Sequence, residues 1–287
     1  MPRKVLEEKL NRMLAEDLGL GDVTSNLIVP EHCNAEAEII AKEEGVAAGI
    51  EEATVLLESL GLNFETYVKD GDEVKPKQVL VKISGDARTI LSVERTLLNI
   101  VSRMSGIATA TRKLVEKIRK AGYKTRVACT RKTAPGLLYF DKKAVSIGGG
   151  DPHRLHLDDM VLIKDNHIAI IGSVEKAVRT AKGKVSFSKK VEVEVSNVND
   201  VLVAAKAGAD IIMLDNFTPK QVEEAVKLLK KAGFFGKVLL EASGKITTDN
   251  AVEFAAEGVN IISLGGITHS VKALDMSLEI VKVKVQK

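Results

Sequence analysis

The chain has 287 residues, of which 45% are hydrophobic and 28% are charged, and its formal net charge is only +3. This balance is typical of a globular protein with one or two domains. The small charge and the aromatic content of 3% argue against nucleic-acid binding, which relies on basic surfaces and stacking side chains. No apolar run reaches the roughly 18 residues of a membrane helix. Cys33 and Cys129 form no CxxC pair, which argues against a zinc-thiolate site. They could form one disulfide, but we favour two buried, reduced thiols in a cytoplasmic protein.

The first hundred residues mix helices and strands. The charged amino-terminal segment predicts an amphipathic helix over residues 3–17 and not a signal peptide. Alternation predicts a strand over 35–45, a helix over 49–61 ends at Gly61, and a DG turn predicts a pair of strands within 68–86. The helical spacing of 89–120 is interrupted near Gly106. We therefore place a domain boundary between residues 105 and 106.

From residue 124 onward, short apolar strands alternate with helices. The predicted strands are 125–129, 160–163, 191–195, 210–214, 237–240 and 260–264, and helices between them include 174–181, 198–207, 219–231 and 249–257. Repeated units of this size predict a parallel sheet, either a barrel or an open sheet, in a domain over residues 106–275. The Val–Lys alternation near the end predicts an antiparallel edge strand over 276–287, which we expect to pack back on the domain of residues 1–105.

Polar residues and glycines follow these strands. They are Thr130, Arg131, Lys132, Lys164, Asp215, Ser243, Gly244, Gly265 and Gly266, with Glu194 inside its strand. Because the carboxyl ends of parallel strands lie at one face, we expect these groups to converge there. Cations, carboxylates and glycines that admit backbone N–H groups together suit a substrate with a phosphate, further anionic groups and hydroxyls.

Each of these residues also has a purely structural interpretation. Gly265 and Gly266 suit a tight turn, Asp215 could cap a helix that begins at Thr218, and Lys164 could be a solvated strand end. Glu194 could face solvent on an edge strand. Their coincidence at the ends of six successive strands favours a shared site over these separate explanations.

Three of the five histidines, His153, His156 and His167, lie within residues 153–168. A catalytic metal commonly takes three ligands of this kind. However, Arg154 adjoins His153 and Lys164 lies three residues before His167, and cations at these points would repel a bound dication. We therefore favour an anion site. Structural roles near strand ends are the default for His156 and His167, and the sequence leaves open whether they do more.

The order of these motifs along nearly the whole chain resembles quinolinate phosphoribosyltransferase, which is also called carboxylating nicotinate-nucleotide pyrophosphorylase. The motifs are EDLGLGDVTS (16–25), VERTLLN (93–99), TRKTAPG (130–136), GGGDPHR (148–154), DDMVLIKDNHI (158–168), VEVEV (191–195), MLDNF (213–217), EASG (241–244) and GGITHS (265–270). The resemblance implies an α/β protein with an amino-terminal α/β sandwich domain and an open α/β barrel of parallel β-α units, assembled as a homodimer.

The resemblance also implies the reaction of a pentosyltransferase, a kind of glycosyltransferase. Quinolinate and 5-phosphoribosyl-1-pyrophosphate (PRPP) would give nicotinate mononucleotide, pyrophosphate and carbon dioxide in de novo NAD biosynthesis, with Mg²⁺ as cofactor. Arginine suits the two substrate carboxylates because its planar fork binds a carboxylate through two hydrogen bonds.

The resemblance assigns roles to individual residues of this chain. The quinolinate site would comprise Arg95 of the partner subunit with Thr130, Arg131, Lys132, His153, Arg154 and Lys164. The PRPP site would comprise Lys132, Lys164, Glu194, Asp215, Ser243, Gly244, Lys245, Leu264, Gly265 and Gly266. The catalytic group would be Lys132, Lys164, Glu194 and Asp215. No side chain is assigned as a direct ligand of magnesium, which would be carried by PRPP near Glu194 and Asp215.

The chain departs from the family pattern at three positions. Leu138 stands where arginine is usual, Lys143 where tyrosine is common, and Lys245 follows Ser243-Gly244 where glycine or asparagine is usual. The nearest alternative function is a molybdenum-transport-associated relative of the same fold with a different substrate. An aldolase that uses Lys164 as a Schiff-base lysine and a non-catalytic phosphosugar-binding regulator are further alternatives. The sequence leaves assembly beyond a dimer open.

Overall fold

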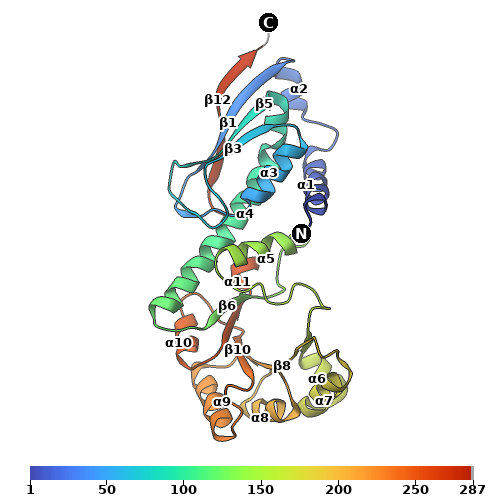
Figure 1. Cartoon of the computed structure of the whole chain (residues 1–287), viewed down its shortest axis with the longest axis vertical. Helices are drawn as coiled ribbons and strands as arrows, with labels where there is room; N and C mark the ends of the chain where they lie inside the picture. The colour runs from blue at the N-terminus through green and yellow to red at the C-terminus, as the bar shows by residue number, and fades with distance from the viewer. Residues whose placement is uncertain (286–287) are drawn as a thin grey trace. The chain divides into compact units, whose positions relative to one another are not determined.

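The structure is a computed structural model of the chain, and it describes residues 1–285. The chain divides into two compact units (Figure 1). One unit contains Met1–Ala110 and the segment that begins at Val271, and the other contains Thr111–Ser270. Gln286 and Lys287, the last residues of the predicted edge strand, lie outside the described residues.

The first unit is built on a four-stranded antiparallel sheet with the order β12-β1-β5-β3. The strands are β1 (Cys33–Ala41), β3 (Asn63–Thr66), β5 (Val79–Asp86) and β12 (Met276–Val285). Every second residue of β1 is buried, as expected when one face of a sheet covers a core. The carboxyl-terminal β12 is an edge strand that pairs along the whole of β1 (Figure 1).

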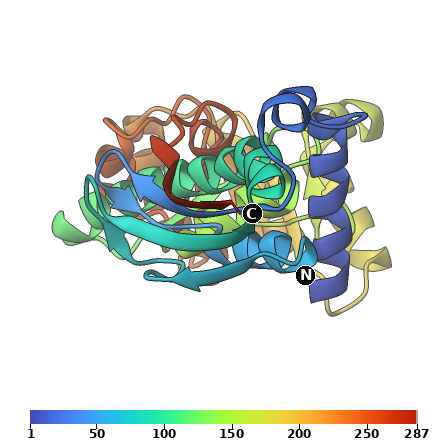
Figure 2. The same cartoon turned by 90° about the horizontal axis from the view of Figure 1, so that it is seen from above.

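Helices complete the first unit. They are α1 (Arg3–Leu18), α2 (Val23–Ile28), α3 (Ile50–Ser59) and the first part of α4 (Ala87–Lys120). Leu6, Leu10 and Leu14 recur every fourth residue and are buried, so α1 presents one apolar face. This helix packs beside α3 (Figure 2).

Two predictions for this unit were wrong. The segment 68–86 contains two strands that do not pair with each other, because β4 (Glu73–Val74) pairs with β2 (Gly45–Val46) and β5 lies between β1 and β3. The helix α4 runs unbroken through Gly106. A Cβ atom on Gly106 would lie 2.2 Å from the carbonyl oxygen of Lys272. This glycine therefore permits close packing of another segment and does not end the helix.

The second unit contains six parallel strands in the order β6-β11-β10-β9-β8-β7. The strands are β6 (Arg126–Cys129), β7 (Val161–Ile163), β8 (Val191–Val195), β9 (Ile211–Asp215), β10 (Leu239–Ser243) and β11 (Ile261–Leu264). No ladder joins β6 to β7 within residues 1–285, so the predicted α/β barrel is open. β10 ends three residues later than predicted, which places Glu241 and Ser243 inside the strand.

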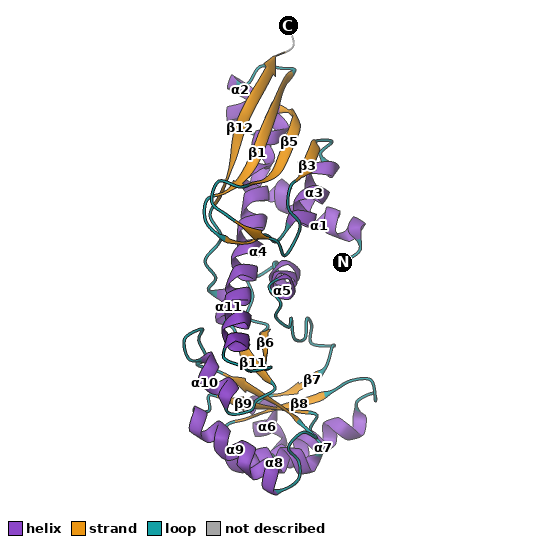
Figure 3. Cartoon of the chain, turned by 60° about the vertical axis from the view of Figure 1, so that its left-hand side comes forward, coloured by secondary structure: helices purple, strands orange, loops and turns teal. Residues whose placement is uncertain are grey.

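The helices of this unit alternate with the strands. They are the end of α4, α5 (Leu138–Ile147), α6 (Asp165–Ile171), α7 (Val174–Lys184), α8 (Val198–Ala207), α9 (Pro219–Lys231), α10 (Ala251–Ala256) and α11 (Gly266–His269). The helices α7, α8 and α9 lie side by side on the outer face of the sheet (Figure 3). This layering leaves the carboxyl ends of the strands open to form a site.

Local sequence explains where the helices after β8 and β9 begin. The Asn197 side chain accepts a hydrogen bond from Asp200 N at the start of α8. Thr218 and Gln221 form a capping box at the start of α9, with Pro219 in its first turn. Thr218 and not Asp215 therefore caps α9. Likewise β8 lies between β7 and β9, so the edge-strand interpretation of Glu194 was wrong.

Two further expectations concern the whole described chain. Cys33 and Cys129 are both buried and neither forms a disulfide. Among residues 1–285, the helices are all too short or too polar to cross a membrane.

Candidate active site

A cavity of about 590 Å³ opens at the carboxyl ends of the parallel strands. The predicted site residues that line it are Thr130, Arg131, Lys132, His153, Arg154, Lys164, Glu194, Asp215, Ser243, Gly244 and Lys245. They include five cationic side chains and two carboxylates, and the completely buried Glu241 lies in the wall behind them. The cavity thus offers an anionic ligand a net positive lining together with fixed negative groups.

Four predicted site residues do not line this cavity. Arg95 lies on α4 in the first unit, and 64% of its side chain is exposed. Leu264 ends β11, and Gly265 and Gly266 follow it. A Cβ atom on Gly265 would lie 3.1 Å from Cδ of Lys132, so this turn backs directly onto a lysine of the cavity. The ligand contacts assigned to these four residues stay predictions.

Lys164 and Glu194 form an ion pair at the cavity, with Nζ 2.7 Å from Oε2. Lys164 directly follows β7 and its side chain is 47% exposed, whereas Glu194 on β8 is only 14% exposed. The backbone N–H of Lys164 donates to Nδ1 of His167 at 2.9 Å, which closes the first turn of α6. His167 therefore has the structural role expected for it, and Lys164 is held at the end of its strand.

A hydrogen bond links the residue after β9 to the end of β10, where a turn that depends on glycine begins. Asn216 N donates to the carbonyl oxygen of Ser243 at 2.9 Å, and Asn216 Nδ2 donates to Asp215 Oδ2 at 2.6 Å. Gly244 has a φ of +80°, and a Cβ there would lie 2.4 Å from Asn216 Oδ1. Lys245 also has a positive φ, of 45°. Only glycine fits at position 244, and the turn exposes backbone there to the cavity.

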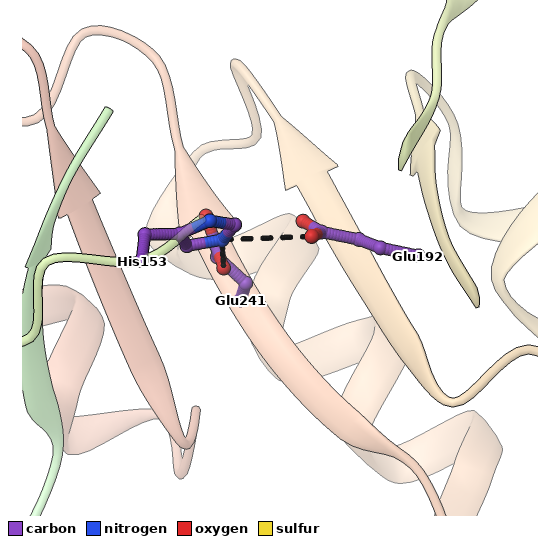
Figure 4. A group of neighbouring side chains, drawn as sticks. All are labelled: His153, Glu192 and Glu241. Carbon is purple, nitrogen blue, oxygen red and sulfur yellow. Dashed lines mark hydrogen bonds and ion pairs between the residues drawn. The ribbon is translucent and has the colours of Figure 1, made fainter. Parts of the chain in front are cut away.

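His153 lies between two buried glutamates that project from β10 and β8 (Figure 4). Its Nε2 lies 3.1 Å from Glu241 Oε2 and 3.5 Å from Glu192 Oε2. Its Nδ1 accepts a hydrogen bond from the backbone N–H of Arg154 at 2.8 Å. A neutral ring in this position carries its proton on Nε2, which donates to Glu241. Both ring nitrogens are thus engaged by the protein, and direct binding of a substrate carboxylate by His153 stays a prediction.

The two glutamates have unusual electrostatics. Both are fully buried, and neither oxygen of Glu192 nor Oε1 of Glu241 has a hydrogen-bond partner among the described residues. Burial, reinforced by the charge of Glu241, raises the pKa of Glu192 from its ordinary 4.5 to about 8. Burial lowers the pKa of His153, but its hydrogen bond to Glu241 and the charges of both glutamates outweigh that effect and raise it overall.

The backbone of His153 is itself strained. Its φ is +53°, a conformation that costs a non-glycine residue on the order of 1–3 kcal/mol and persists only where its surroundings impose it. The backbone N–H of His153 donates to Asp151 Oδ1 at 2.7 Å. Nζ of the fully buried Lys142 donates to the carbonyl oxygen of Pro152 and, at 2.8 Å, to that of Arg154. These bonds hold the chain on both sides of the strained residue.

The cluster of His153, Glu192 and Glu241 also has the composition of a metal site, since its ligand atoms lie within 4.8 Å of one another. A metal on Nε2 requires the remaining ring proton to be on Nδ1. Here Nδ1 accepts the Arg154 N–H, so the ring geometry favours a proton on Nε2 and not a metal. The neighbouring cations Arg154 and Lys164 would also repel a metal ion at this position.

Sequence reasoning missed three buried residues beside this cavity: Lys142, Glu192 and Glu241. Glu192 precedes Glu194 by two residues on one strand, so both side chains point to the same face. That spacing was a signal that could have identified Glu192. Glu241 directly follows the predicted strand 237–240, and the sequence pattern assigns it no role. Lys142 had no comparable signal, because a lysine on a short helix is ordinarily solvated.

Comparisons with known proteins agree over most of the chain. The family descriptions that match are the quinolinate phosphoribosyl transferase C-terminal domain over residues 107–279 and its N-terminal domain over residues 22–105. A probable carboxylating nicotinate-nucleotide pyrophosphorylase of Methanocaldococcus jannaschii is 48% identical over 277 residues, covering 95% of this chain and 96% of the relative. The human carboxylating nicotinate-nucleotide pyrophosphorylase is 39% identical over 246 residues, covering 86% and 82%.

Solved structures give the same result. The nicotinate-nucleotide pyrophosphorylase of Francisella tularensis matches with a TM-score of 0.88 and 39% identity, covering 98% of this chain and 97% of that one. Sequence and structure comparisons therefore indicate the same family for both units, and the chain belongs to the quinolinate phosphoribosyl transferase family.

Proposed function

We propose that this protein transfers the phosphoribosyl group of PRPP to quinolinate and releases pyrophosphate and carbon dioxide, with nicotinate mononucleotide as product. The observation that carries the proposal is the joint placement of Arg131, Arg154 and the Lys164–Glu194 pair around one cavity, in a chain with the relatives described above. Guanidinium groups suit the two carboxylates of quinolinate, and lysines suit a departing pyrophosphate. Within the cell, we place this reaction in the cytoplasm.

The first chemical step joins the ring nitrogen of quinolinate to the anomeric carbon of the ribose while the bond to pyrophosphate breaks. Positive charge develops on the ribose, and the fixed carboxylates of Glu194 and Asp215 stabilise it. Lys132 and Lys164 balance the negative charge on the pyrophosphate. Positioning and electrostatics suffice for this step, so a covalent nucleophile is unnecessary.

The second step removes one carboxylate. The ribosylated ring nitrogen is positive, and its charge stabilises the electron pair that stays on the adjacent ring carbon when carbon dioxide leaves. A proton then adds to that carbon and gives nicotinate mononucleotide. Arg131 and Arg154 hold the carboxylates in place, and we assign Arg95 of the partner subunit to the same group. Ser243, Gly244 and the turn at Gly265 and Gly266 hold the 5′-phosphate.

Magnesium is part of the proposal. The cavity supplies oxygen donors from Glu194 and Asp215, which is the chemistry that this cation prefers, and three nearby lysines disfavour a dication that arrives without its own anion. Bound together with PRPP, magnesium would neutralise charge on the pyrophosphate. We also propose a homodimer whose active site includes Arg95 of the partner subunit.

The alternatives have less support. No observation favours a molybdenum-transport role, and the relatives named above are described as pyrophosphorylases. An aldolase needs a desolvated lysine to form a Schiff base. Lys164 is 47% exposed and paired with Glu194, which is a poor setting for that chemistry.

The deciding assay combines the purified protein with quinolinate, PRPP and MgCl₂ and measures nicotinate mononucleotide and carbon dioxide. We expect both products in equal amounts. Nicotinic acid should be a poor substrate, because it lacks the second carboxylate for which Arg131 and Arg154 are both available. A folded protein that forms no nicotinate mononucleotide would exclude the proposed function, and turnover of nicotinic acid as fast as quinolinate would exclude the assigned role of the arginines.

A further inference from the structure

The loop of residues 151–154, which we call the Arg154 loop, brings an arginine to the cavity. Charged side chains with no part in the proposed reaction hold this loop. Lys142, on α5, is 1% exposed, and Glu192 and Glu241 are completely buried. Three ionisable side chains buried around one short loop are costly to desolvate, so their positions call for a specific role.

Lys142 holds the main chain of the Arg154 loop. Its Nζ donates to the carbonyl oxygens of Pro152 and Arg154, the residues on either side of His153. The loop is also joined to β6, because Asp151 N donates to Val127 O at 2.7 Å. The carbonyl groups that flank the residue with positive φ therefore cannot shift without breaking a buried bond to a cation.

Glu241 holds the side chain of the same loop. It accepts from His153 Nε2 at 3.1 Å, and Glu192 lies 3.5 Å from that nitrogen on the far strand (Figure 4). The other ring nitrogen, Nδ1, accepts the backbone N–H of Arg154. The contacts thus run from β10 through the imidazole to the main chain of Arg154, whose side chain lines the cavity.

We propose that Lys142 and Glu241 are positioning residues that fix the Arg154 loop, and that Glu192, near the same ring nitrogen as Glu241, supports them. By fixing the loop they direct the Arg154 side chain towards a substrate carboxylate. The proposal rests on the proposed function for the identity of that carboxylate. Lys142 acts through main-chain carbonyls, and Glu241 acts through the ring of His153. Neither residue needs to touch the substrate for this role.

Steady-state kinetics of the full-length protein can test this. Lys142→Met and Glu241→Leu should raise the KM for quinolinate roughly 10- to 100-fold, while the KM for PRPP changes by less than about threefold. Glu241→Gln keeps an oxygen that can accept from His153 Nε2, so it should retain a KM for quinolinate close to that of the wild type. A merely structural role would lower thermal stability and leave the KM of the folded fraction unchanged.

The matched control is Arg112, which also holds backbone carbonyls near the end of α5. Its side chain donates to Gly148 O at 3.2 Å and to Ile147 O at 3.1 Å, outside the Arg154 loop. Arg112→Met should therefore leave the KM for quinolinate unchanged. An equal rise in KM for Arg112→Met and Lys142→Met would overturn the proposal.

A double-mutant cycle tests whether Lys142 acts through Arg154. If it does, Lys142→Met should raise the KM for quinolinate in the wild-type background but add nothing in an Arg154→Met background. Independent, additive effects would overturn the proposal. If Lys142→Met does not fold, Glu241→Leu takes its place in the same cycle with Arg154→Met.

A spectroscopic measurement keeps this test separate from the proposed function. At a pH where the ring is neutral, ¹⁵N NMR of His153 should show the Nε2–H tautomer in the wild type and in Glu241→Gln, with an Nε2 resonance typical of a hydrogen-bonded N–H, and this resonance should shift in Glu241→Leu, where the acceptor is lost. An unchanged Nε2 resonance in Glu241→Leu would overturn the proposal even if the enzyme is active. A wild-type protein with the expected tautomers but no nicotinate mononucleotide would instead contradict the proposed function alone.

Discussion

Nζ of Lys164 lies 2.7 Å from Oε2 of Glu194, and this pair joins the end of β7 to β8 at the wall of the cavity. Because Lys164 is 47% exposed, the pair should contribute no more than about 1 kcal/mol to stability. Its importance should be catalytic, since Lys164 is assigned to the leaving pyrophosphate. We expect Lys164→Met to lower kcat/KM by roughly 100- to 1,000-fold with little change in melting temperature.

Lys182 provides the control for this prediction. It forms an ion pair of similar exposure with Asp210, with Nζ 3.0 Å from Oδ2, away from the residues that line the cavity. Lys182→Met should change stability as little as Lys164→Met does and should leave kcat/KM unaltered. Product formation and thermal unfolding of both variants check the prediction, which is wrong if both lysines affect catalysis equally.

The turn at Gly244 should tolerate no side chain. Gly244→Ala adds a Cβ that would lie 2.4 Å from Asn216 Oδ1, at a φ of +80°. We expect a loss of about 1–3 kcal/mol in the free energy of unfolding and a higher KM for PRPP, because the phosphate turn must move. Gly236 has nearly the same φ, +81°, but open space around its Cβ position. Gly236→Ala should therefore show the conformational cost without the change in KM, and equal KM values in the two variants would contradict the assigned phosphate site.

Glu192 should make stability depend on pH. Its pKa is raised to about 8 in the folded protein from an ordinary 4.5, so the native state keeps a proton that the unfolded state loses. Its contribution to stability is complete below pH 4.5 and disappears as pH rises to about 8. Over that window the free energy of unfolding should fall by at most about 1.4 kcal/mol per pH unit on account of this group.

Urea unfolding between pH 5 and pH 8 measures this contribution when the wild type is compared with Glu192→Gln, which has no proton to lose. The difference in free energy of unfolding between the two proteins should change steadily across the window. The exposed Glu253 is the control, and Glu253→Gln should follow the wild-type slope. Parallel curves for wild type and Glu192→Gln would show that Glu192 is already ionised in the folded state.

Arg95 should act across a subunit interface. Arg95→Ala and Lys164→Ala homodimers should each be inactive, because each active site lacks one required residue. Co-expressed chains with different affinity tags should form mixed dimers in which one of the two sites is complete. Randomly mixed subunits should recover about a quarter of wild-type activity. If mixed dimers stay inactive while both variants fold and dimerise, Arg95 does not contribute to the partner's site.

The sequence by itself determined the architecture of the second unit and most of the residues at its cavity. Residues that follow parallel strands must meet at one edge of the sheet, so the order of β-strands and helices was enough to bring Arg131, Lys164 and Asp215 together. The same logic predicted Lys132 and Ser243. Local patterns carry this information because the alternation of strand and helix fixes the direction of every strand.

Tertiary structure alone decided the features that depend on which segments approach each other. Nothing local shows that Gly106 meets the backbone of Lys272, and a glycine within a helical pattern ordinarily suggests a break. The pairing of β5 with β1 and β3 is likewise a long-range choice. Nζ of the buried Lys142 donates to the carbonyl groups on either side of His153, a contact that brings together residues of α5 and the Arg154 loop around the positive φ of His153. The spacing to Glu194 shows which face of the strand Glu192 occupies, but its burial and its raised pKa arise from contacts with distant segments such as that of Glu241.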